Sequence, residues 1–315
     1  MKQPLIIITG PTASGKTALS VELAKRIGGE IISADSMQVY RYMDVGSAKV
    51  TKEEMDGVPH HLIDVLDPKD AFNVVVFQEM AKKAMEEIYA NGHIPIVVGG
   101  TGFYIQALLN DIDFTENDGD MEYRQKLEKL AAEKGAEVLH AKLREVDPAS
   151  ADAIHANNVK RVIRALEFYE KTGKRISEHN EEERQKDSPY NFAYYVLNMD
   201  RARLYSRIDM RVDKMVEDGL EEEVKNLKAM GCTRDMVSMQ GLGYKEILDY
   251  LNGEISLDEA VYILKRDTRH FAKRQLTWFK REKEVTWINQ EDFEFERGKM
   301  LDWMENDLKA RNIIK

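Results

Sequence analysis

The chain has 315 residues, with 43% hydrophobic and 32% charged residues and a formal net charge of −10, a length and composition that allow a large core and argue against disorder. No apolar run approaches the roughly 20 residues that a membrane-spanning helix needs, so we expect a soluble, cytoplasmic protein without a membrane partner. The single cysteine, Cys232, excludes an intrachain disulfide and a cysteine-based zinc site.

The most informative motif lies near the start of the chain. GPTASGKT at residues 10–17 matches the G-x-x-x-x-G-K-[ST] pattern of a phosphate-binding loop, with a β-branched apolar run typical of a buried strand before it and helical spacing over residues 18–27 after it. Backbone N–H groups and the helix N-terminus bind phosphates in such a loop, Lys16 adds a positive charge, and the Thr17 hydroxyl can ligate Mg²⁺. We therefore predict a diphosphate or triphosphate site with a Mg²⁺ cofactor, made of Gly10, Pro11, Thr12, Ala13, Ser14, Gly15, Lys16 and Thr17.

Residues 30–35 are predicted to form a second short strand that ends in the carboxylate of Asp35. Because ligands of open α/β sheets lie beyond the C-terminal ends of the strands, Asp35 should face the same crevice as the phosphate loop. Residues 60–65 are a further candidate strand. Their adjacent histidines, His60 and His61, would point to opposite faces, which makes a poor metal pair, so we interpret them as structural.

Residues 74–90 have helical periodicity, and residues 93–98 form a buried strand that runs into Gly99-Gly100-Thr101-Gly102. Glycine at a strand end would let a ligand approach the backbone, and this position favours a site role for Thr101 over an ordinary turn. The alternation of strands and helices up to residue 109 predicts an α/β fold with a P-loop NTPase-like parallel sheet.

The pattern changes after this point. Residues 113–190 have helical spacing throughout, so we predict a helical insertion domain there and a P-loop core formed by residues 1–112 plus 191–315. Residues 193–199 return as a strand. The C-terminal region is mostly helical, with a possible last strand at residues 284–288.

Two basic runs stand out in this acidic chain. Residues 265–283 contain eight Lys or Arg against two acidic residues, and residues 157–175 contain six against two. A basic run is often only a solvated helix face, but two of them favour a polyanion partner.

Separated motifs follow one another along nearly the whole chain. They are GPTASGKT at 10–17, ISADSMQVYRYMDVGSAK at 32–49, VPHHLID at 58–64, VVGGTGFY at 97–104, RVIRALE at 161–167, GLGYKE at 241–246 and KRQLTWFK at 273–280. This ordered set resembles the bacterial tRNA dimethylallyltransferases, also called isopentenyl-diphosphate:tRNA transferases. The resemblance implies transfer of a dimethylallyl group from dimethylallyl diphosphate to N6 of the adenosine 3′-adjacent to the anticodon in tRNA, with release of diphosphate.

This reaction assigns roles to the residues at the predicted crevice. Adenine N6 is a poor nucleophile, and Asp35 is the candidate base that orients it and takes its proton. Lys16, the loop amides and a Mg²⁺ held through Thr17 would stabilise the departing diphosphate. Thr101 would bond the leaving oxygen or the adenine. Arg211 lies four residues after Arg207 on one helix face, and the resemblance makes it a second diphosphate contact.

The resemblance also implies contacts with the anticodon stem-loop of tRNA. Asp35, Ser36, Met37 and Gln38 would line the adenine pocket, and two further segments would hold the RNA: Lys160, Arg161, Val162, Ile163 and Arg164, and Gln240, Gly241, Leu242, Gly243, Tyr244 and Lys245. Arg124 is a further candidate contact. The insertion and the basic C-terminal helices would hold the RNA from two sides. We expect the protein to be a monomer.

Two other classes of function remain open at this stage. A P-loop kinase acting on a nucleoside or small metabolite would share the loop, the sheet and an aspartate at a strand end, and its lid would take the place of the insertion. A non-catalytic RNA-binding protein could keep a nucleotide for regulation.

Overall fold

The structure is a computed structural model that describes residues 2–114 and 121–315. The chain divides into two compact units, the larger formed by Met1–Leu108 with Tyr190–Lys315 and the smaller by Leu109–Pro189. The sequence predicted the insertion at residues 113–190, which begins four residues after the smaller unit does and ends one residue beyond it. Each unit has its own hydrophobic core.

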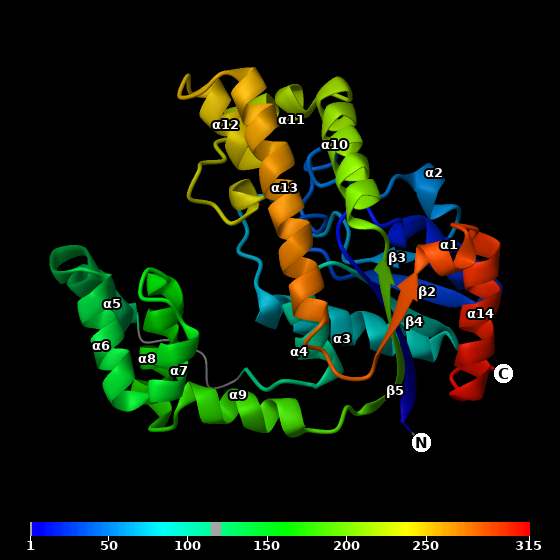
Figure 1. The fold of residues 1–315 in the computed structure, drawn as a ribbon, viewed down its shortest axis with the longest axis horizontal. Helices are drawn as coiled ribbons and strands as arrows, with labels where there is room; N and C mark the ends of the chain where they lie inside the picture. Colours follow the sequence, from blue (N-terminus) through cyan, green and yellow to red (C-terminus); the bar gives the residue numbers. More distant parts are fainter. Residues whose placement is uncertain (1, 115–120) are drawn as a thin grey trace. The chain divides into compact units, whose positions relative to one another are not determined.

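The described part of the larger unit contains one six-stranded parallel sheet (Figure 1). Its strands are β1 (Gln3–Thr9), β2 (Gly29–Ser33), β3 (His60–His61), β4 (Ile94–Gly99), β5 (Tyr190–Asn198) and β6 (Val285–Asn289), in the order β3-β2-β4-β1-β5-β6. The central strand β1 is covered on both faces, and its residues from Leu5 onward are buried, as its apolar, β-branched sequence indicates. Thr9 at its end is in register with Gly99 of β4 and Val196 of β5, so three neighbouring strands end at one edge. The predicted α/β fold with a parallel sheet is confirmed.

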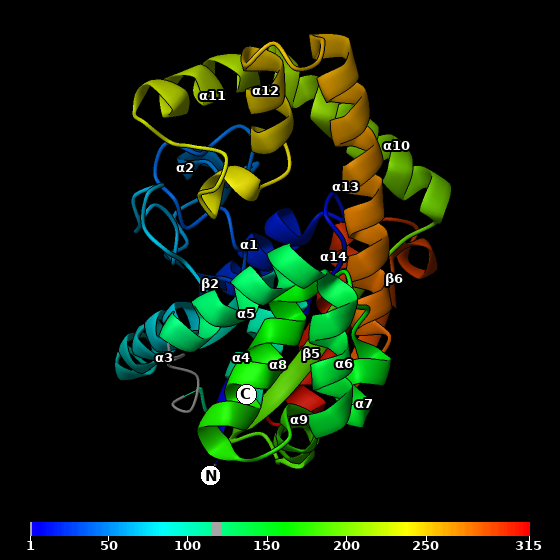
Figure 2. The same ribbon diagram turned by 90° about the vertical axis from the view of Figure 1, so that its left-hand side faces the viewer.

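Helices of the larger unit cover the sheet and extend beyond its C-terminal edge. They are α1 (Lys16–Ile27), α2 (Lys52–Met55), α3 (Val74–Ala90), α4 (Gly102–Leu109), α10 (Arg201–Glu217), α11 (Leu220–Ala229), α12 (Tyr244–Leu251), α13 (Leu257–Phe279) and α14 (Arg297–Ala310), with short 3₁₀ turns η2 (Ser238–Gln240) and η3 (Gln290–Phe293). Asn73 caps α3 by accepting hydrogen bonds from the amides of Val75 and Val76. Figures 1 and 2 both show α10 and α13 packed side by side.

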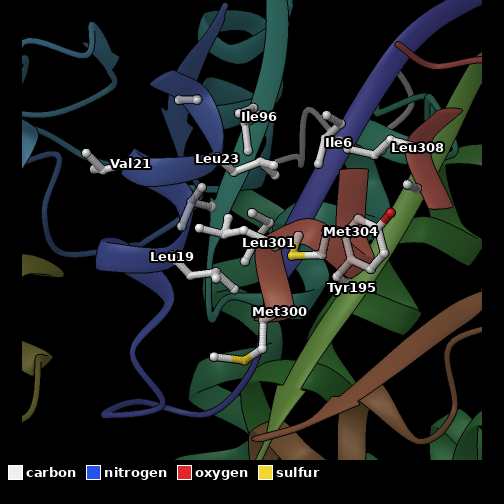
Figure 3. Packing of buried hydrophobic residues seen from close by; sticks show 14 of the residues in the cluster. Ile6, Leu19, Val21, Leu23, Ile96, Tyr195, Met300, Leu301, Met304 and Leu308 are labelled. Carbon is white, nitrogen blue, oxygen red and sulfur yellow. The ribbon is translucent and has the colours of Figure 1, made fainter. Parts of the chain in front are cut away.

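One hydrophobic core joins both ends of the chain to the sheet (Figure 3). Leu19 and Leu23 of α1 meet Leu301 and Met304 of α14, and the strands contribute residues such as Ile6. All five side chains are 2% exposed or less, so this packing fixes the helix that carries the phosphate loop.

The smaller unit is helical, as the sequence spacing indicates. Its described helices are α5 (Met121–Lys134), α6 (Ala136–Val146), α7 (Pro148–Ala153), α8 (Val159–Thr172) and α9 (Ile176–Gln185), of which α5, α6 and α8 pack together (Figure 2). The buried carboxylate of Asp147 caps α7 through the Ser150 amide at 3.0 Å. It also accepts the Ser177 amide and hydroxyl at 3.0 and 2.7 Å, which ties α9 to α7.

One predicted strand is much shorter than expected. Residues 60–65 were expected to be extended, but β3 ends at His61 because Leu62 and Asp64 adopt positive φ angles of 63° and 56°. The Asp64 and Val65 amides bond instead to the carbonyls of Gln38 and Val39. His61 Nε2 lies 2.7 Å from Glu30 Oε2, which is a structural contact. Among the described helices, none is long and apolar enough to cross a membrane.

Gly99 at the end of β4 provides a test of this packing. A Cβ there would lie 2.2 Å from the Ala34 carbonyl oxygen, and backbone cannot move aside cheaply. We expect Gly99→Ala to lower the free energy of unfolding by about 1–3 kcal/mol in urea denaturation. Gly298→Ala is the matched control, because Gly298 lies in α14 with open space around it and alanine favours a helix. Equal stability of the two variants would contradict this packing.

Candidate active site

The predicted phosphate loop connects β1 to α1. Its shape requires left-handed backbone at Gly15, which caps α1 with φ of 89°, and at Ala13, with φ of 62°. Lys16 Nζ donates to the carbonyls of Gly10 and Pro11 at 3.0 and 2.8 Å, which holds the ammonium group against the loop. Thr17 follows in the first turn of α1 and is exposed. The loop therefore has the form of an anion cradle.

The electrostatics of the cradle are unusual. The pKa of Lys16 is lowered to about 7, chiefly by burial and also by the nearby Arg211, while Asp35 opposes both. Burial likewise lowers the pKa of Arg211, which the negative charges of Asp35 and Glu54 partly offset. Two crowded cations and one carboxylate favour an anion at this place.

Two arginines of α10 reach the phosphate loop from outside. Arg207 Nε donates to the Ala13 carbonyl at 2.8 Å, and Arg211 Nη1 donates to Thr12 Oγ1 at 2.9 Å. Asp200 caps the start of this helix by accepting from the amides of Ala202 and Arg203. The spacing of four residues placed both arginines on one face, and that face lies against the loop.

Asp35 follows β2 and lies at the same edge of the sheet. Its Oδ1 accepts from the amides of Met37 and Gln38 at 2.8 and 3.4 Å, which fixes the carboxylate relative to the segment that follows it. The side-chain Nε2 of Gln38 donates in turn to the carbonyls of Ala48 and Ser47 at 3.2 and 3.5 Å. Hydrogen bonds therefore connect the Asp35 carboxylate to residues 37 and 38, and through Gln38 to residues 47 and 48.

A side chain of α13 joins the phosphate loop to the glycine-rich loop after β4. Gln275 Oε1 accepts the Thr12 amide, and its Nε2 donates to the Gly100 carbonyl, both at 2.9 Å. A Cβ on Gly100 would lie 2.1 Å from that nitrogen. Ala34, Gln275 and Trp278 of the protein itself occupy the space that a Cβ would need at Gly99, Gly100 and Gly102, and Gly100 also lines the adjacent cavity, where a ligand can approach its backbone.

These segments surround a cavity of about 390 Å³ within the larger unit. Its polar lining includes Thr12, Asp35, Ser36, Thr101, Arg211, Gln240, Lys245 and Gln275. Its apolar lining includes Met37, Phe72, Tyr104, Val212, Met215, Leu242, Leu264 and Phe271. Thr12 of the phosphate loop, the Arg211 cation and the Asp35 carboxylate thus line one space that also has room for apolar groups.

Ten of the twenty site residues that the sequence predicts in the larger unit line this cavity, and Thr12 is the one among them that belongs to the phosphate loop. Thr12 of the loop, Asp35, Ser36, Met37, Thr101, Arg211, Gln240, Gly241, Leu242 and Lys245 line the one cavity. Tyr244 does not: its side chain is fully buried, and its hydroxyl donates to Glu223 at 2.9 Å. A contact between the Tyr244 side chain and RNA is therefore excluded in this fold, and Gly243 beside it is also buried.

The predicted RNA contacts of the smaller unit divide into two groups. Lys160, Arg161 and Arg164 are exposed on α8. Val162 and Ile163 are 0% and 3% exposed in the core of the unit, so the expectation that their side chains touch RNA is wrong: helical spacing turns them inward. Arg124 forms a two-point ion pair with Glu167 at 2.8 and 2.7 Å, which uses its guanidinium within the unit and weakens the case for an RNA contact.

The basic run at residues 265–283 divides in the same way. Lys265 and Arg269 pair with Asp213 and Asp209 of α10, each at 2.5 Å, and so attach α13 to α10. His270, Lys273, Arg274, Thr277, Trp278 and Arg281 line a separate hollow of about 380 Å³ along α13. Therefore the part of the basic run that lines this hollow is available to bind a polyanion, whereas Lys265 and Arg269 are engaged in ion pairs.

Two residues that make important structural contacts, Gln275 and Glu223, were not predicted from the sequence. Gln275 lies among cationic residues in the motif KRQLTWFK. Its hydrogen-bond partners lie 263 and 175 residues away in the sequence. Glu223, the other, belongs to an acidic run that looks like a solvated helix start. No local signal in the sequence marks either one.

Comparisons with known proteins agree with this architecture. A model of the family described as IPP transferase matches residues 38–282. The tRNA dimethylallyltransferase of Lachnoclostridium phytofermentans is 60% identical over 313 residues, which cover 99% of this chain and 100% of that protein.

Solved structures extend the similarity to the fold. The crystal structure of the tRNA isopentenylpyrophosphate transferase from Bacillus halodurans matches with a TM-score of 0.74 at 47% identity, covering 99% of this chain and 98% of that chain. A crystal structure of a eukaryotic dimethylallyltransferase acting on tRNA matches with a TM-score of 0.79 at 31% identity, covering 91% of this chain and 74% of that one.

The pKa of Lys16 yields a prediction for anion binding. A bound diphosphate favours the charged ammonium, so it raises a pKa that is about 7 in the free site. We expect binding of inorganic diphosphate to take up a proton at about pH 8, and the affinity to fall as the pH rises above 7. Titration calorimetry in buffers of different ionisation enthalpy measures this uptake.

Two lysine variants separate this effect from the ionisation of the ligand. Lys16→Met should lose the protein's share of the proton uptake, whereas Lys25→Met, at the exposed end of α1, should keep it. If Lys16→Met took up as many protons as the wild type, the assignment to Lys16 would be wrong.

Proposed function

This chain belongs to the IPP transferase family, and we propose that it transfers a dimethylallyl group from dimethylallyl diphosphate to N6 of the adenosine 3′-adjacent to the anticodon of tRNA. The observation that carries the proposal is the cavity that Thr12 of the phosphate loop, Arg211 and Asp35 line together. A leaving diphosphate needs the loop and the arginine, and a nucleophilic amine needs the carboxylate.

The phosphate loop serves a leaving group in this reaction. As the allylic C–O bond breaks, negative charge develops on the diphosphate oxygen. Lys16, Arg211 and the loop amides are already in place to stabilise that charge, and they need little rearrangement during the reaction. No phosphoryl group is transferred.

Asp35 acts on the other reactant. The N6 lone pair is delocalised into the purine ring, so the amine attacks well only when its proton is removed as the new C–N bond forms. Oδ1 of Asp35 is engaged by the backbone amides of Met37 and Gln38, so we assign Oδ2 to accept the N6 proton. The proton then passes to solvent, and the electron pair of the C–O bond leaves with the diphosphate.

The residues present fit a Mg²⁺ ion bound together with the diphosphate. Among residues 2–114 and 121–315 no cluster of three or more His, Cys, Asp or Glu is arranged to hold a metal, whereas the Thr17 hydroxyl is exposed beside the loop. Mg²⁺ is commonly held in this way, by one protein oxygen, the substrate phosphates and water. When bound, the ion would neutralise part of the diphosphate charge.

The RNA contacts require a base that is turned out of its stack, because a stacked adenine does not expose N6 to a protein cavity. We assign the adenine side of the cavity to Asp35, Ser36 and Met37, with Gln38 behind them on the carbonyls of Ser47 and Ala48. We assign contacts with the RNA backbone to Lys160, Arg161 and Arg164 and to the basic hollow along α13. We further propose that the protein acts as a monomer, in the cytoplasm.

Asp35 supplies the decisive variant. Asp35→Asn keeps the oxygen that accepts the Met37 and Gln38 amides but cannot take a proton, so turnover should fall by about 10² or more while tRNA still binds. The assay is diphosphate release from dimethylallyl diphosphate that depends on added tRNA. Full activity of Asp35→Asn would remove Asp35 as the base. ATP turnover that needs no tRNA would favour a kinase instead.

Arg161 tests the RNA surface of α8. Arg161→Ala removes one exposed phosphate contact and should weaken tRNA binding several-fold, with a smaller salt dependence and no change in diphosphate affinity. Arg144→Ala, which removes an exposed arginine of α6 paired with Asp152, is the control. Filter binding over a range of salt concentrations measures both. Equal losses in the two variants would mean that α8 is not specifically involved.

A further inference from the structure

We infer that Glu223 is a positioning residue that holds residues 44–48 as one wall of the catalytic cavity. The inference rests on the proposed function, because it concerns the side of the cavity assigned to the adenine. Glu223 lies near the start of α11 and is only partly exposed, so its carboxylate faces the protein.

The carboxylate binds three consecutive amides. Glu223 Oε2 accepts from the N–H groups of Asp44 and Val45, both at 2.7 Å, and Oε1 accepts from the N–H of Gly46 at 3.0 Å. Oε1 also accepts the Tyr244 hydroxyl at 2.9 Å. Successive N–H groups that converge on one anion form a backbone nest, an arrangement that usually binds a phosphate or another free anion. Here the anion belongs to the protein itself.

The geometry requires a carboxylate. Each oxygen of Glu223 faces a backbone donor, so an amide in either orientation would place its own NH₂ group against an N–H. The packing is also tight: a Cβ on Gly46 would lie 2.6 Å from the Tyr244 ring and 2.9 Å from Leu220. The loop is thus held to α11 and α12 by hydrogen bonds and by contact.

The loop carries this constraint into the cavity. Gly46, Ser47 and Ala48 line the cavity together with Asp35. The carbonyls of Ser47 and Ala48 accept hydrogen bonds from the side-chain Nε2 of Gln38. The backbone N–H of Gln38 donates to Asp35 Oδ1. A connected path therefore runs from Glu223 through the loop to the catalytic carboxylate.

The far end of the loop is fixed separately. The ammonium group of Lys49 is buried and donates to the Tyr40 carbonyl at 2.7 Å, to Asp44 at 2.6 Å and to Asp64 at 2.5 Å. Without Glu223 the loop would keep its contacts with Lys49, one of which is to the Asp44 side chain, and would lose the hydrogen bonds to the backbone amides of residues 44–46. The phosphate loop should be unaffected, since Gln275, Gln290 and the arginines of α10 hold it.

Kinetics provide the first test. Glu223→Gln should raise the KM for tRNA about tenfold and lower kcat, since hydrogen bonds to a charged group are lost. Affinity for inorganic diphosphate should not change. Tyr244→Phe, which removes one of the four bonds and no volume, should give a smaller change in the same direction. Glu222→Gln, the same charge change at the exposed neighbouring position, should behave as wild type.

Amide hydrogen exchange provides a second readout that does not depend on catalysis. In Glu223→Gln, the amides of residues 44–46 should exchange about tenfold faster or more, with wild-type rates in β1 and α1. Unchanged exchange would overturn the inference. So would faster exchange with unaltered tRNA kinetics, or a parallel loss of diphosphate affinity, which indicates general destabilisation. If the wild type transfers no prenyl group, the proposed function fails, and the exchange result still shows whether Glu223 holds the loop.

Discussion

The carboxamide of Gln275 joins the two loops that leave β1 and β4, neighbouring strands of the sheet. It accepts the Thr12 amide of one loop and donates to the Gly100 carbonyl of the other, both at 2.9 Å, from a residue that is 6% exposed. Both loops and α13 must therefore keep fixed positions, because a buried amide that loses either partner is costly. Glycine at position 100 follows from this constraint, since the Gln275 nitrogen occupies the space of a Cβ. The catalytic cavity is the space that these fixed segments enclose together with α10.

The charges around the cavity are arranged for an anion. Lys16 bonds to the carbonyls of its own loop, Arg211 bonds to Thr12, and Asp35 bonds to the amides of its own segment, so all three are held in place by partners other than one another. Burial lowers the pKa values of both cations, and repulsion from a neighbouring arginine adds to this, from Arg211 at Lys16 and from Arg207 at Arg211. A departing diphosphate would relieve that repulsion at the moment when its own charge develops, and this is the preorganised stabilisation that transfer of an allylic group requires.

Local patterns predicted the fold well. The loop at residues 10–17 sits between a strand and a helix as expected, and α3 has the predicted bounds. The errors lie where long-range contacts decide. Residues 62–65 leave the sheet because the amides of Asp64 and Val65 bond to the carbonyls of Gln38 and Val39. The inward orientation of Val162 and Ile163, by contrast, follows from helical spacing, so the local pattern already indicates it. Gln275 and Glu223 were invisible because each acts on a segment more than a hundred residues away, and no spacing rule connects such pairs.

The central claim is that the phosphate loop and Asp35 serve the same cavity, with the anion on one side and the nucleophile on the other. A crystal structure with dimethylallyl thiolodiphosphate, in which sulfur replaces the bridging oxygen so that the leaving group departs slowly, tests it most directly. We predict the diphosphate in the loop at residues 10–17 and against Arg211, with the allylic carbon pointing into the space beside the Asp35 carboxylate. A diphosphate bound elsewhere, or an allylic carbon separated from Asp35 by protein, would contradict the account.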